Sequence, residues 1–292
     1  MSGRVVVAGA VAVEEWVRWE RLPAPSAVRR ASRVDLMLGG SAAVASVAAS
    51  AAGAATRCVG VVGTDPAGAA VRQHLARADV DVTALVPLPG PTARVQRALA
   101  ADSLIATEGE DGTSAAELLL LPGAGWGPGP VAADVALARC EPGDVLLLEW
   151  STLEEAEPLV AAAYELDLQI VALLSPYPLL PQALDLPLID VAVVDQTGGA
   201  HLADAGELPG SLCVLVGQEG LSWDGETVLA PPARSGLPAD RRHAVLAGAL
   251  AGRLACGDDR PEAAARALEL AIAAAGGADP WRRLRLDLEE LG

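Results

Sequence analysis

The chain has 292 residues, long enough for a sizeable core, and we expect a single domain over residues 1–292. Its formal net charge of -17 argues against a nucleic-acid partner, because phosphate contacts need clustered basic side chains. Lysine is absent, which excludes a Walker A phosphate loop, since the lysine of that loop must reach the phosphates.

Cysteine and histidine are too few and too scattered for a disulfide framework or a structural zinc site. The four cysteines lie far apart without a CxxC pair, and the chain has three histidines. We therefore expect no metal site and a cytoplasmic location. The apolar run Val5 to Val13 is followed by Glu14-Glu15-Trp16, where a signal peptide would have small residues, so we interpret it as a buried strand. Residues 39–56 carry no charge but are too weakly apolar for a membrane span, and no membrane partner is expected.

Four extended segments lie in the first half of the chain, and no helix is predicted between the last two. Val11 to Glu20 and Val34 to Leu38 precede a double glycine, whereas Thr92 to Ala100 and Ala115 to Leu121 follow later, separated by the polar turn GEDGTS. These segments predict a small separate sheet, with lid strands from about residues 11–38 and 91–121.

Residues 37–68 predict a loop, a helix, a strand, a turn and a second helix. The stretch begins at Gly39-Gly40, runs through Ala, Ser and Val residues, and turns into a short β-type run from Cys58 to Val62. Asp65 followed by Pro66 is typical of a helix N-cap with proline at the first helical position.

The second half of the chain alternates strands and helices. Its four short apolar runs are Asp144 to Glu149, Gln169 to Leu174, Ile189 to Val194 and Leu212 to Val216. A helix from about Asp240 to Cys256 carries Ala and Gly residues that allow close approach to the sheet. This alternation predicts an α/β fold with three layers and a mostly parallel central sheet.

The order of these parts resembles the ribokinase family of sugar and nucleoside kinases, the PfkB type of carbohydrate kinase. The resemblance covers nearly the whole chain and rests on the first strand ending in Gly9, the double glycine with its small-residue helix, GTDPAG, SPYP, VGQEG and AVLAGALAGRL. It implies a ribokinase-like fold with a β-sheet lid. The family's activity is phosphoryl transfer from ATP with Mg²⁺ to an alcohol group of a sugar or nucleoside.

The resemblance also shows where this chain departs from the family's catalytic motif. The GAGD motif, whose Asp is the base and whose glycines form an anion hole, falls on Asp240-Arg241-Arg242-His243. His243 then stands at the base position, and the glycines are absent. An alternative register with a short insertion would place Asp240 there instead.

The substrate and nucleotide positions depart as well. The acidic residue that binds sugar hydroxyls falls on Glu14, and the Asn after Gly39-Gly40 falls on Val44, which cannot hydrogen-bond a hydroxyl. The remaining positions implied for the nucleotide cleft are Asp195, Gly198, Leu215, Gly217 and Gly220. The NxxE motif associated with metal and phosphates thereby loses its carboxylate, because Gly198 takes the place of its Glu.

Each position also has a structural interpretation. Asp65 is explained as a helix cap, Glu14 as an exposed charge beside the lid, and His243 as a helix-start histidine. Arg241 and Arg242 oppose the dipole at the start of a helix by about 0.3–1 kcal/mol each, so one hypothesis is that they and His243 bind an anionic ligand or a partner's carboxylate; the other is that they point into solvent.

Two functional hypotheses follow. In the first, a ribokinase-fold protein has lost ordinary ATP-dependent sugar phosphorylation and acts by binding a small molecule or a protein partner. In the second, the chain is an active sugar or nucleoside kinase with a relocated base, Asp240 or His243, or hosts another reaction in the same cleft. ATP and Mg²⁺ are cofactors only if the kinase activity survives. The family resemblance further implies a homodimer formed through the lid.

Overall fold

The architecture is described from a computed structural model. It describes residues 3–19, 28, 30–100, 117–121, 123–125, 127, 129, 131–149, 156–174, 188–195, 199–200, 212–216, 220–229 and 239–276. The SPYP motif and the predicted nucleotide-cleft positions Gly198 and Gly217 lie outside these residues. Within them, no helix is long and apolar enough to cross a membrane.

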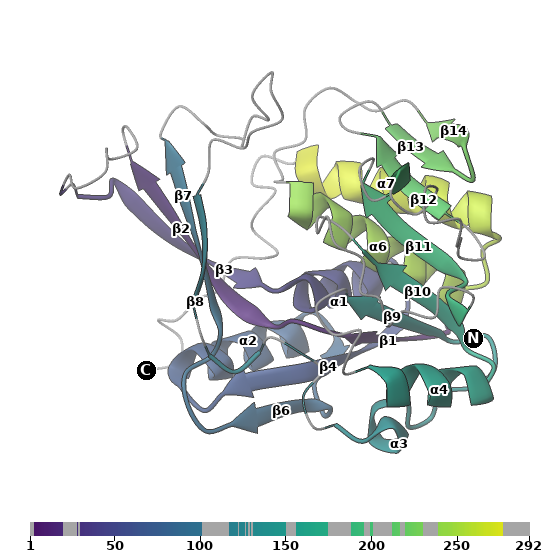
Figure 1. Ribbon diagram of the computed structural model, residues 1–292, viewed down its shortest axis with the longest axis horizontal. Coiled ribbons are helices and arrows are strands. Elements are labelled where there is room, and N and C mark those ends of the chain that lie inside the picture. Colours follow the sequence, from purple (N-terminus) through teal and green to yellow (C-terminus); the bar gives the residue numbers. More distant parts are fainter. Residues whose placement is uncertain are drawn as a thin grey trace.

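The central sheet is mostly parallel, as the sequence predicts (Figure 1). Its order is β14-β13-β12-β11-β10-β9-β1-β4-β5, with β6 beside β4, and only β13 and β14 join antiparallel. The strands are β1 Arg4–Ala8, β4 Ala55–Gly63, β5 Val80–Asp81, β6 Leu85–Leu88, β9 Val145–Glu149, β10 Gln169–Leu173, β11 Val191–Asp195, β12 Leu212–Val216, β13 Gly220–Trp223 and β14 Glu226–Leu229.

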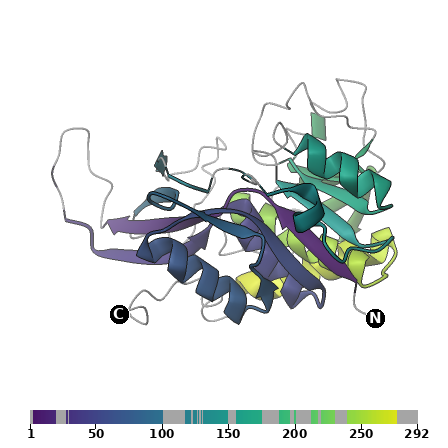
Figure 2. The same cartoon turned by 90° about the horizontal axis from the view of Figure 1, so that it is seen from below.

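Helices cover both faces of this sheet, which gives the three predicted layers (Figure 2). One layer holds α1 Ser41–Ala51, α2 Pro66–Arg77, α6 Ala239–Ala255 and α7 Arg260–Gly276, and the other holds α3 Ala133–Ala136 and α4 Glu157–Glu165. Side chains of alternate residues along a strand pack against opposite helical layers. Val5 and Val7 of β1 pack with the α1 and α6 side, whereas Val6 and Ala8 pack with α3 and α4.

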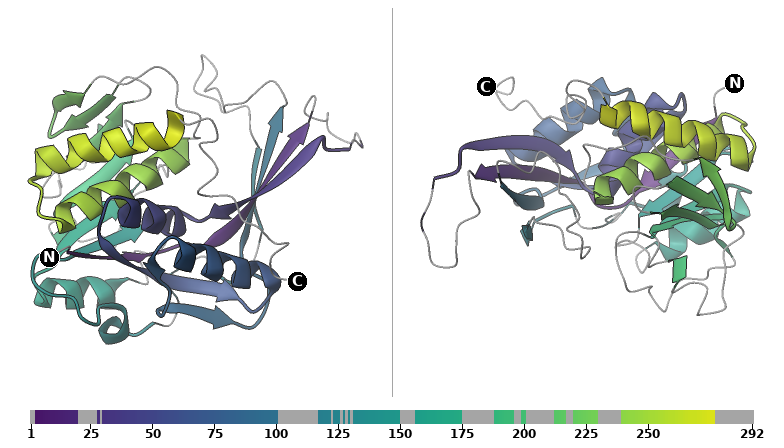
Figure 3. Two further views of the ribbon diagram at one scale, coloured as in Figure 1. Left: turned by 180° about the vertical axis from the view of Figure 1, so that it is seen from behind. Right: turned by 90° about the horizontal axis from the view of Figure 1, so that it is seen from above.

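The small residues of α6 allow it to approach α1 closely as well as the sheet (Figure 3). A Cβ built on Gly248 would lie 2.1 Å from the carbonyl oxygen of Ala45, and one on Gly252 would lie 2.8 Å from that of Ala49. The sequence prediction of close approach is therefore correct, but it named the sheet and missed α1 as the tightest contact.

The lid is a second sheet of four strands that stands away from the body (Figures 1 and 3). Its order is β3-β2-β7-β8, with β2 Ala12–Trp19, β3 Arg33–Gly39, β7 Arg94–Ala100 and β8 Glu117–Leu121. The separate sheet is confirmed. The interpretation of Val5 to Val13 as one buried strand is wrong, because β1 ends at Ala8 and β2 begins at Ala12, with Gly9, Ala10 and Val11 between them.

Asp65 has the architectural role expected of a cap. Its carboxylate accepts hydrogen bonds from Gly68 N at 3.0 Å and from the Thr92 hydroxyl at 2.5 Å. Partial burial raises the pKa of Asp65, but these hydrogen bonds outweigh it and hold the pKa below its usual value. Thr92 precedes β7, so the cap joins the start of α2 to the start of a lid strand.

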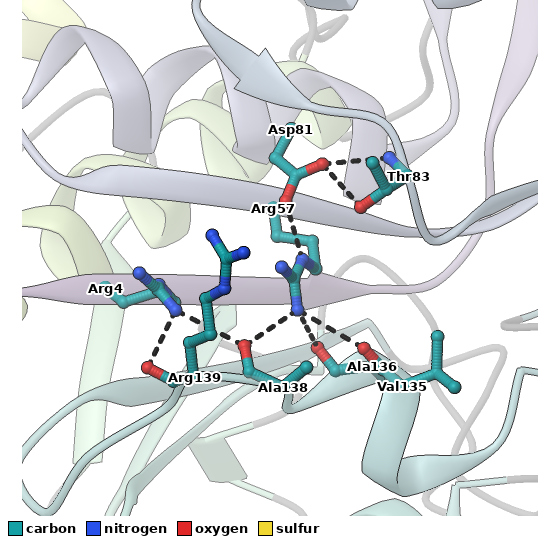
Figure 4. A network of polar contacts seen from close by, with 8 residues as sticks. All are labelled: Arg4, Arg57, Asp81, Thr83, Val135, Ala136, Ala138 and Arg139. Carbon is teal, nitrogen blue, oxygen red and sulfur yellow. Dashed lines mark hydrogen bonds and ion pairs between the residues drawn. The ribbon is translucent and has the colours of Figure 1, made fainter.

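Arg57 of β4 links α3 to the central sheet at the amino ends of the parallel strands (Figure 4). Its Nη1 donates to the carbonyls of Val135, Ala136 and Ala138, and its Nε is 2.9 Å from Asp81. The carbonyls at the end of a helix lack internal donors, and a guanidinium satisfies several of them at once. This network is structural and lies at the amino ends of the parallel strands.

Candidate functional site

The candidate site lies at the carboxyl edge of the parallel strands, where sheets of this kind place their ligands. The end of β1 leads through Gly9 into the lid strand β2, and α1 and α6 both begin near this edge. Gly40 has φ +78°, and a Cβ there would lie 2.2 Å from the carbonyl oxygen of Ala10, so glycine is required for this close approach. The double glycine Gly39-Gly40 thus holds the start of α1 against the end of β1.

Glu14 is the centre of a buried ion-pair cluster, and the interpretation of it as an exposed charge is wrong. Only 3% of Glu14 is exposed. Its Oε1 accepts from Arg97 Nε of β7 at 2.7 Å, and its Oε2 accepts from Arg241 of α6, from Nε at 2.9 Å and from Nη2 at 2.5 Å. Two arginines from different parts of the fold therefore hold both oxygens of one lid carboxylate.

The charges of the two arginines keep Glu14 ionised. Burial raises the pKa of Glu14, but the positive charges of Arg241 and Arg97 and their hydrogen bonds together hold it below the usual value. The same carboxylate also places negative charge beside the start of α6, where the helix dipole favours it. The unfavourable position of Arg241 on α6 is thus offset by a partner from the lid.

Trp16 packs against this cluster on the same face of β2. The ring centroid is 5.5 Å from the guanidinium carbon of Arg241, 5.8 Å from that of Arg97 and 6.0 Å from that of Arg18. Arginines at these distances are attracted by the ring face. Trp16 and Trp19 lie on opposite faces of a strand, so at least one is expected to pack against a neighbour, and Trp16 does, with 3% of the residue exposed.

The other residues at the start of α6 differ in their environments. Arg241 is 2% exposed and His243 is 6% exposed, so neither points into solvent, while Arg242 is half-buried. Burial lowers the pKa of His243 to about 4, although Asp195 acts in the opposite direction. Asp240 lies in α6, but its side chain is outside the described part of the structure.

Val44 lies in the hydrophobic core and does not face an open cleft. It is 2% exposed and packs in the cluster that joins α1 and α6 to the sheet. Its backbone N–H donates to the Gly40 carbonyl at 3.1 Å. The double glycine and its helix therefore keep their structural role without a polar side chain at this position.

Glu149 is a buried carboxylate at the same edge that the sequence analysis missed as a site residue. It ends β9, is 3% exposed, and accepts from Ala10 N at 3.3 Å. A Cβ on Gly9 would lie 2.5 Å from the Glu149 Cβ, so Gly9 leaves room for it. The signal was present in the sequence, because a glutamate ends the apolar run DVLLLE at the carboxyl edge of a buried strand.

The predicted nucleotide-cleft positions are described in part. Asp195, at the end of β11, is in register with Leu215 of β12, and Gly220 begins β13. These three therefore lie on neighbouring strands, and Asp195 is close enough to His243 to influence its pKa. Among the described residues, no group of three His, Cys, Asp or Glu side chains could hold a metal ion.

The N-terminal third of the chain matches a known family. Residues 2–103 match the model of the pfkB family carbohydrate kinases. No curated protein matches the sequence significantly.

Solved structures match over the whole chain. Ribokinase from Thermotoga maritima is 15% identical with a TM-score of 0.76, and the match covers 100% of this chain and 98% of that chain. Ribokinase from Cryptococcus neoformans in complex with ADP is 18% identical with a TM-score of 0.74 and 100% coverage of both chains. Arabidopsis thaliana ribokinase complexed with ribose and ATP is 17% identical, with a TM-score of 0.72 and coverage of 100% and 98%.

Proposed function

We propose that this chain, which has the fold of the ribokinases, is a carbohydrate kinase-like protein of the PfkB type that has lost ordinary ATP-dependent sugar phosphorylation and acts by binding a small molecule or a protein partner. The observation that carries the proposal is the state of Glu14. Both oxygens of this carboxylate, at the position implied for sugar hydroxyls, are occupied by Arg97 and Arg241 of the same chain.

The charges of the cluster make Glu14 a poor ligand for a neutral sugar. A hydroxyl group would have to replace a charge-assisted hydrogen bond, which is roughly twice as strong as a neutral one. Displacing one arginine would also leave a buried charge without its partner, which typically costs about 3–5 kcal/mol. A neutral sugar offers no charge to compensate for that loss.

The catalytic position supports the same proposal. A general base works best with a pKa near the working pH, and burial lowers the pKa of His243 to about 4. Asp240 and Arg242 replace the two glycines of the implied anion hole, and Arg241, at the alanine position between them, has a side chain that reaches across to the lid. Loss of a general base costs roughly 10²- to 10⁴-fold in rate, and loss of one oxyanion donor costs roughly 10²- to 10³-fold.

An active kinase with a relocated base, Asp240 or His243, is the second candidate. One observation favours it: the Asp195 carboxylate acts on His243 and raises its pKa against the effect of burial. A histidine beside a carboxylate is a common arrangement for proton transfer. ATP and Mg²⁺ would be required in this case.

Release of ADP in the presence of ATP, Mg²⁺ and a panel of sugars and nucleosides separates the two candidates. We expect no acceptor-dependent release above the rate without acceptor. Acceptor-dependent release that disappears in either Asp240→Ala or His243→Ala, but persists in the control His74→Ala on α2, would establish the kinase instead. Thermal unfolding of each variant shows whether it is folded during the assay.

We further propose that the protein works in the cytoplasm as a homodimer joined through its lid sheets, without a nucleic-acid or membrane partner. The proposal is supported by Val34 of β3, which is 54% exposed on the face of the lid opposite to Trp16. Sedimentation at several concentrations tests it. A monomer at every concentration would rule out the lid contact.

A further inference from the structure

Arg139, in the loop between α3 and β9, has a backbone conformation that an arginine disfavours. Its φ is +68°, in the left-handed region. The other non-glycine residues with positive φ in the described part of the chain are all aspartates, whose short polar side chains tolerate this region better. Strained residues of this kind are concentrated at functional sites. The conformation of Arg139 therefore directs attention to what its side chain does.

The side chain of Arg139 points towards two other guanidinium groups at the amino edge of the sheet, where the parallel strands begin (Figure 4). Arg4 of β1 and Arg57 of β4 both donate through Nη1 to the Ala138 carbonyl, at 3.3 Å and 3.0 Å. Their guanidinium groups therefore lie beside each other. The Arg139 guanidinium makes no hydrogen bond or ion pair within the described part of the chain.

Arg4 and Arg57 have a structural role that leaves some of their donors unused. Arg57 Nη1 also donates to the carbonyls of Val135 and Ala136, and Arg4 Nη1 donates to that of Arg139 at 2.7 Å, so both arginines satisfy carbonyls at the end of α3. Nη2 of Arg57 and both Nε and Nη2 of Arg4 make no hydrogen bond among the described residues. These nitrogens can bind an anion while the carbonyl contacts stay in place.

The carboxylates at this edge leave the three arginines with an excess of positive charge. Asp81 pairs with Arg57 at 2.9 Å, and Asp144 accepts from the backbone nitrogens of Arg4 at 2.7 Å and of Glu141 at 2.9 Å. No other carboxylate forms an ion pair with the three arginines in the described part of the chain. Since like charges repel one another, an anion between the guanidinium groups would stabilise this arrangement.

We propose that Arg4, Arg57 and Arg139 form a binding site for a phosphate group at the amino edge of the sheet. Guanidinium groups match phosphate oxygens with paired donors, and three of them can contact a tetrahedral dianion from different sides. A planar carboxylate offers only two oxygens. The phosphate is either free inorganic phosphate or the phosphate group of a small monoester. The parallel strands separate this site from the candidate site at their carboxyl edge, so its test does not depend on the proposed function.

Isothermal titration of the full chain without nucleotide tests the ligand class. The probes are inorganic phosphate, methyl phosphate and acetate, at constant ionic strength so that screening is equal. We expect phosphate to bind about tenfold or more tightly than acetate, the fold-change of one charged hydrogen bond. Binding of methyl phosphate as well would assign the site to monoesters, and its failure to bind would assign it to free phosphate. No binding of either phosphate compound, or acetate binding as tightly, would overturn the proposal.

Arg139→Met then tests whether the phosphate binds at the amino edge. The Arg139 guanidinium makes no described contact, so the variant should fold as the wild type does. We expect its affinity for phosphate to fall by about tenfold or more. Arg266→Met on α7 removes the same charge from an exposed position and should bind as the wild type does. Unchanged affinity in Arg139→Met would overturn the assignment, because the phosphate would then bind elsewhere.

Arg139→Gly separates the effect of the backbone from that of the guanidinium group. Glycine adopts a positive φ without strain, so this variant should unfold at the same temperature as the wild type or higher in phosphate-free buffer. Phosphate should raise the unfolding temperature of the wild type, because it binds the folded state, and should not raise that of the variant. An equal rise in both proteins would overturn the proposal. Neither measurement uses ATP or an acceptor, so its failure is distinct from failure of the proposed function.

Discussion

At the scale of single residues, one substitution changes the chemistry of several others. Arg241, at a position where the resemblance implies a small residue of the family motif, reaches the lid and donates to the Glu14 carboxylate. Glu14 has the carboxylate that the sequence suggests for contact with a ligand, but this carboxylate is bound by two arginines of the same chain. The chemical meaning of Glu14 therefore depends on Arg97 and Arg241, which are 83 and 227 residues away in the sequence.

Removing the Glu14 charge should destabilise the protein strongly. Glu14→Gln removes the buried carboxylate charge that Arg97 and Arg241 both contact, so we expect the free energy of unfolding to fall by about 3–5 kcal/mol at pH 7, measured by urea denaturation. The neighbouring Glu15→Gln is the control, since Arg94 and Glu15 form a more exposed pair, and should cost about 1 kcal/mol or less. Equal losses in the two variants would contradict the special role of Glu14.

The effect of Glu14→Gln should also depend on pH. The folded-state pKa of Glu14 is lowered, so its contribution is fully present above the unfolded-state pKa, near 4.5, and is lost as the pH falls through the folded-state value. The difference in unfolding free energy between wild type and variant should therefore shrink below about pH 4.5. A difference that stays constant to the acid limit would show that the carboxylate charge is not its source.

His243 should make the protein less stable in mild acid. Its folded-state pKa of about 4 lies below its unfolded-state value of 6.5, so protonation favours the unfolded state. Stability should fall as the pH decreases from about 6.5 to about 4, by about 3 kcal/mol from this group. In His243→Gln this part of the slope should disappear, whereas His74→Gln should keep it. NMR titration of the three histidines provides the pKa directly.

At the scale of elements, the contact between α1 and α6 carries the site. Both helices begin at the carboxyl edge of the sheet, and α6 can hold Arg241 near the lid only because its backbone lies so close to α1. That closeness requires glycine at the crossing, since Gly248 faces the Ala45 carbonyl oxygen.

Gly248→Ala tests this packing. Alanine favours a helix by about 1 kcal/mol over glycine, yet its Cβ would lie 2.1 Å from the Ala45 oxygen, so the helices must separate. We expect a net loss of about 2 kcal/mol in unfolding free energy by urea denaturation. Gly252→Ala, with its closest contact at 2.8 Å, should lose less. A Gly248→Ala protein more stable than the wild type would mean that the helix crossing is not this tight.

At the scale of the whole molecule, the fold was predictable and the site was predictable only in part. Local signals such as the apolar runs, Asp65-Pro66 and the double glycine act within a few residues, so the sequence indicates the layers, the lid sheet and the Asp65 cap. The pairing of Glu14 with Arg241 joins parts of the chain that only the folded topology brings together. For the same reason the contacts of Arg241 could not be derived from spacing along the chain, whereas Glu149 could have been found, because it ends the apolar run DVLLLE.

The lid and the body are joined by the Glu14 cluster, so the cluster should control how readily the lid opens. Arg97 and Glu14 belong to the lid, and Arg241 to α6 of the body. In Arg241→Met the lid loses this buried link, so we expect faster amide hydrogen exchange in β2 and β7, with exchange in β1, β9 and β10 unchanged. Arg266→Met should match the wild type throughout. Faster exchange in all strands would indicate global destabilisation, and unchanged exchange in β2 and β7 would show that the cluster does not hold the lid.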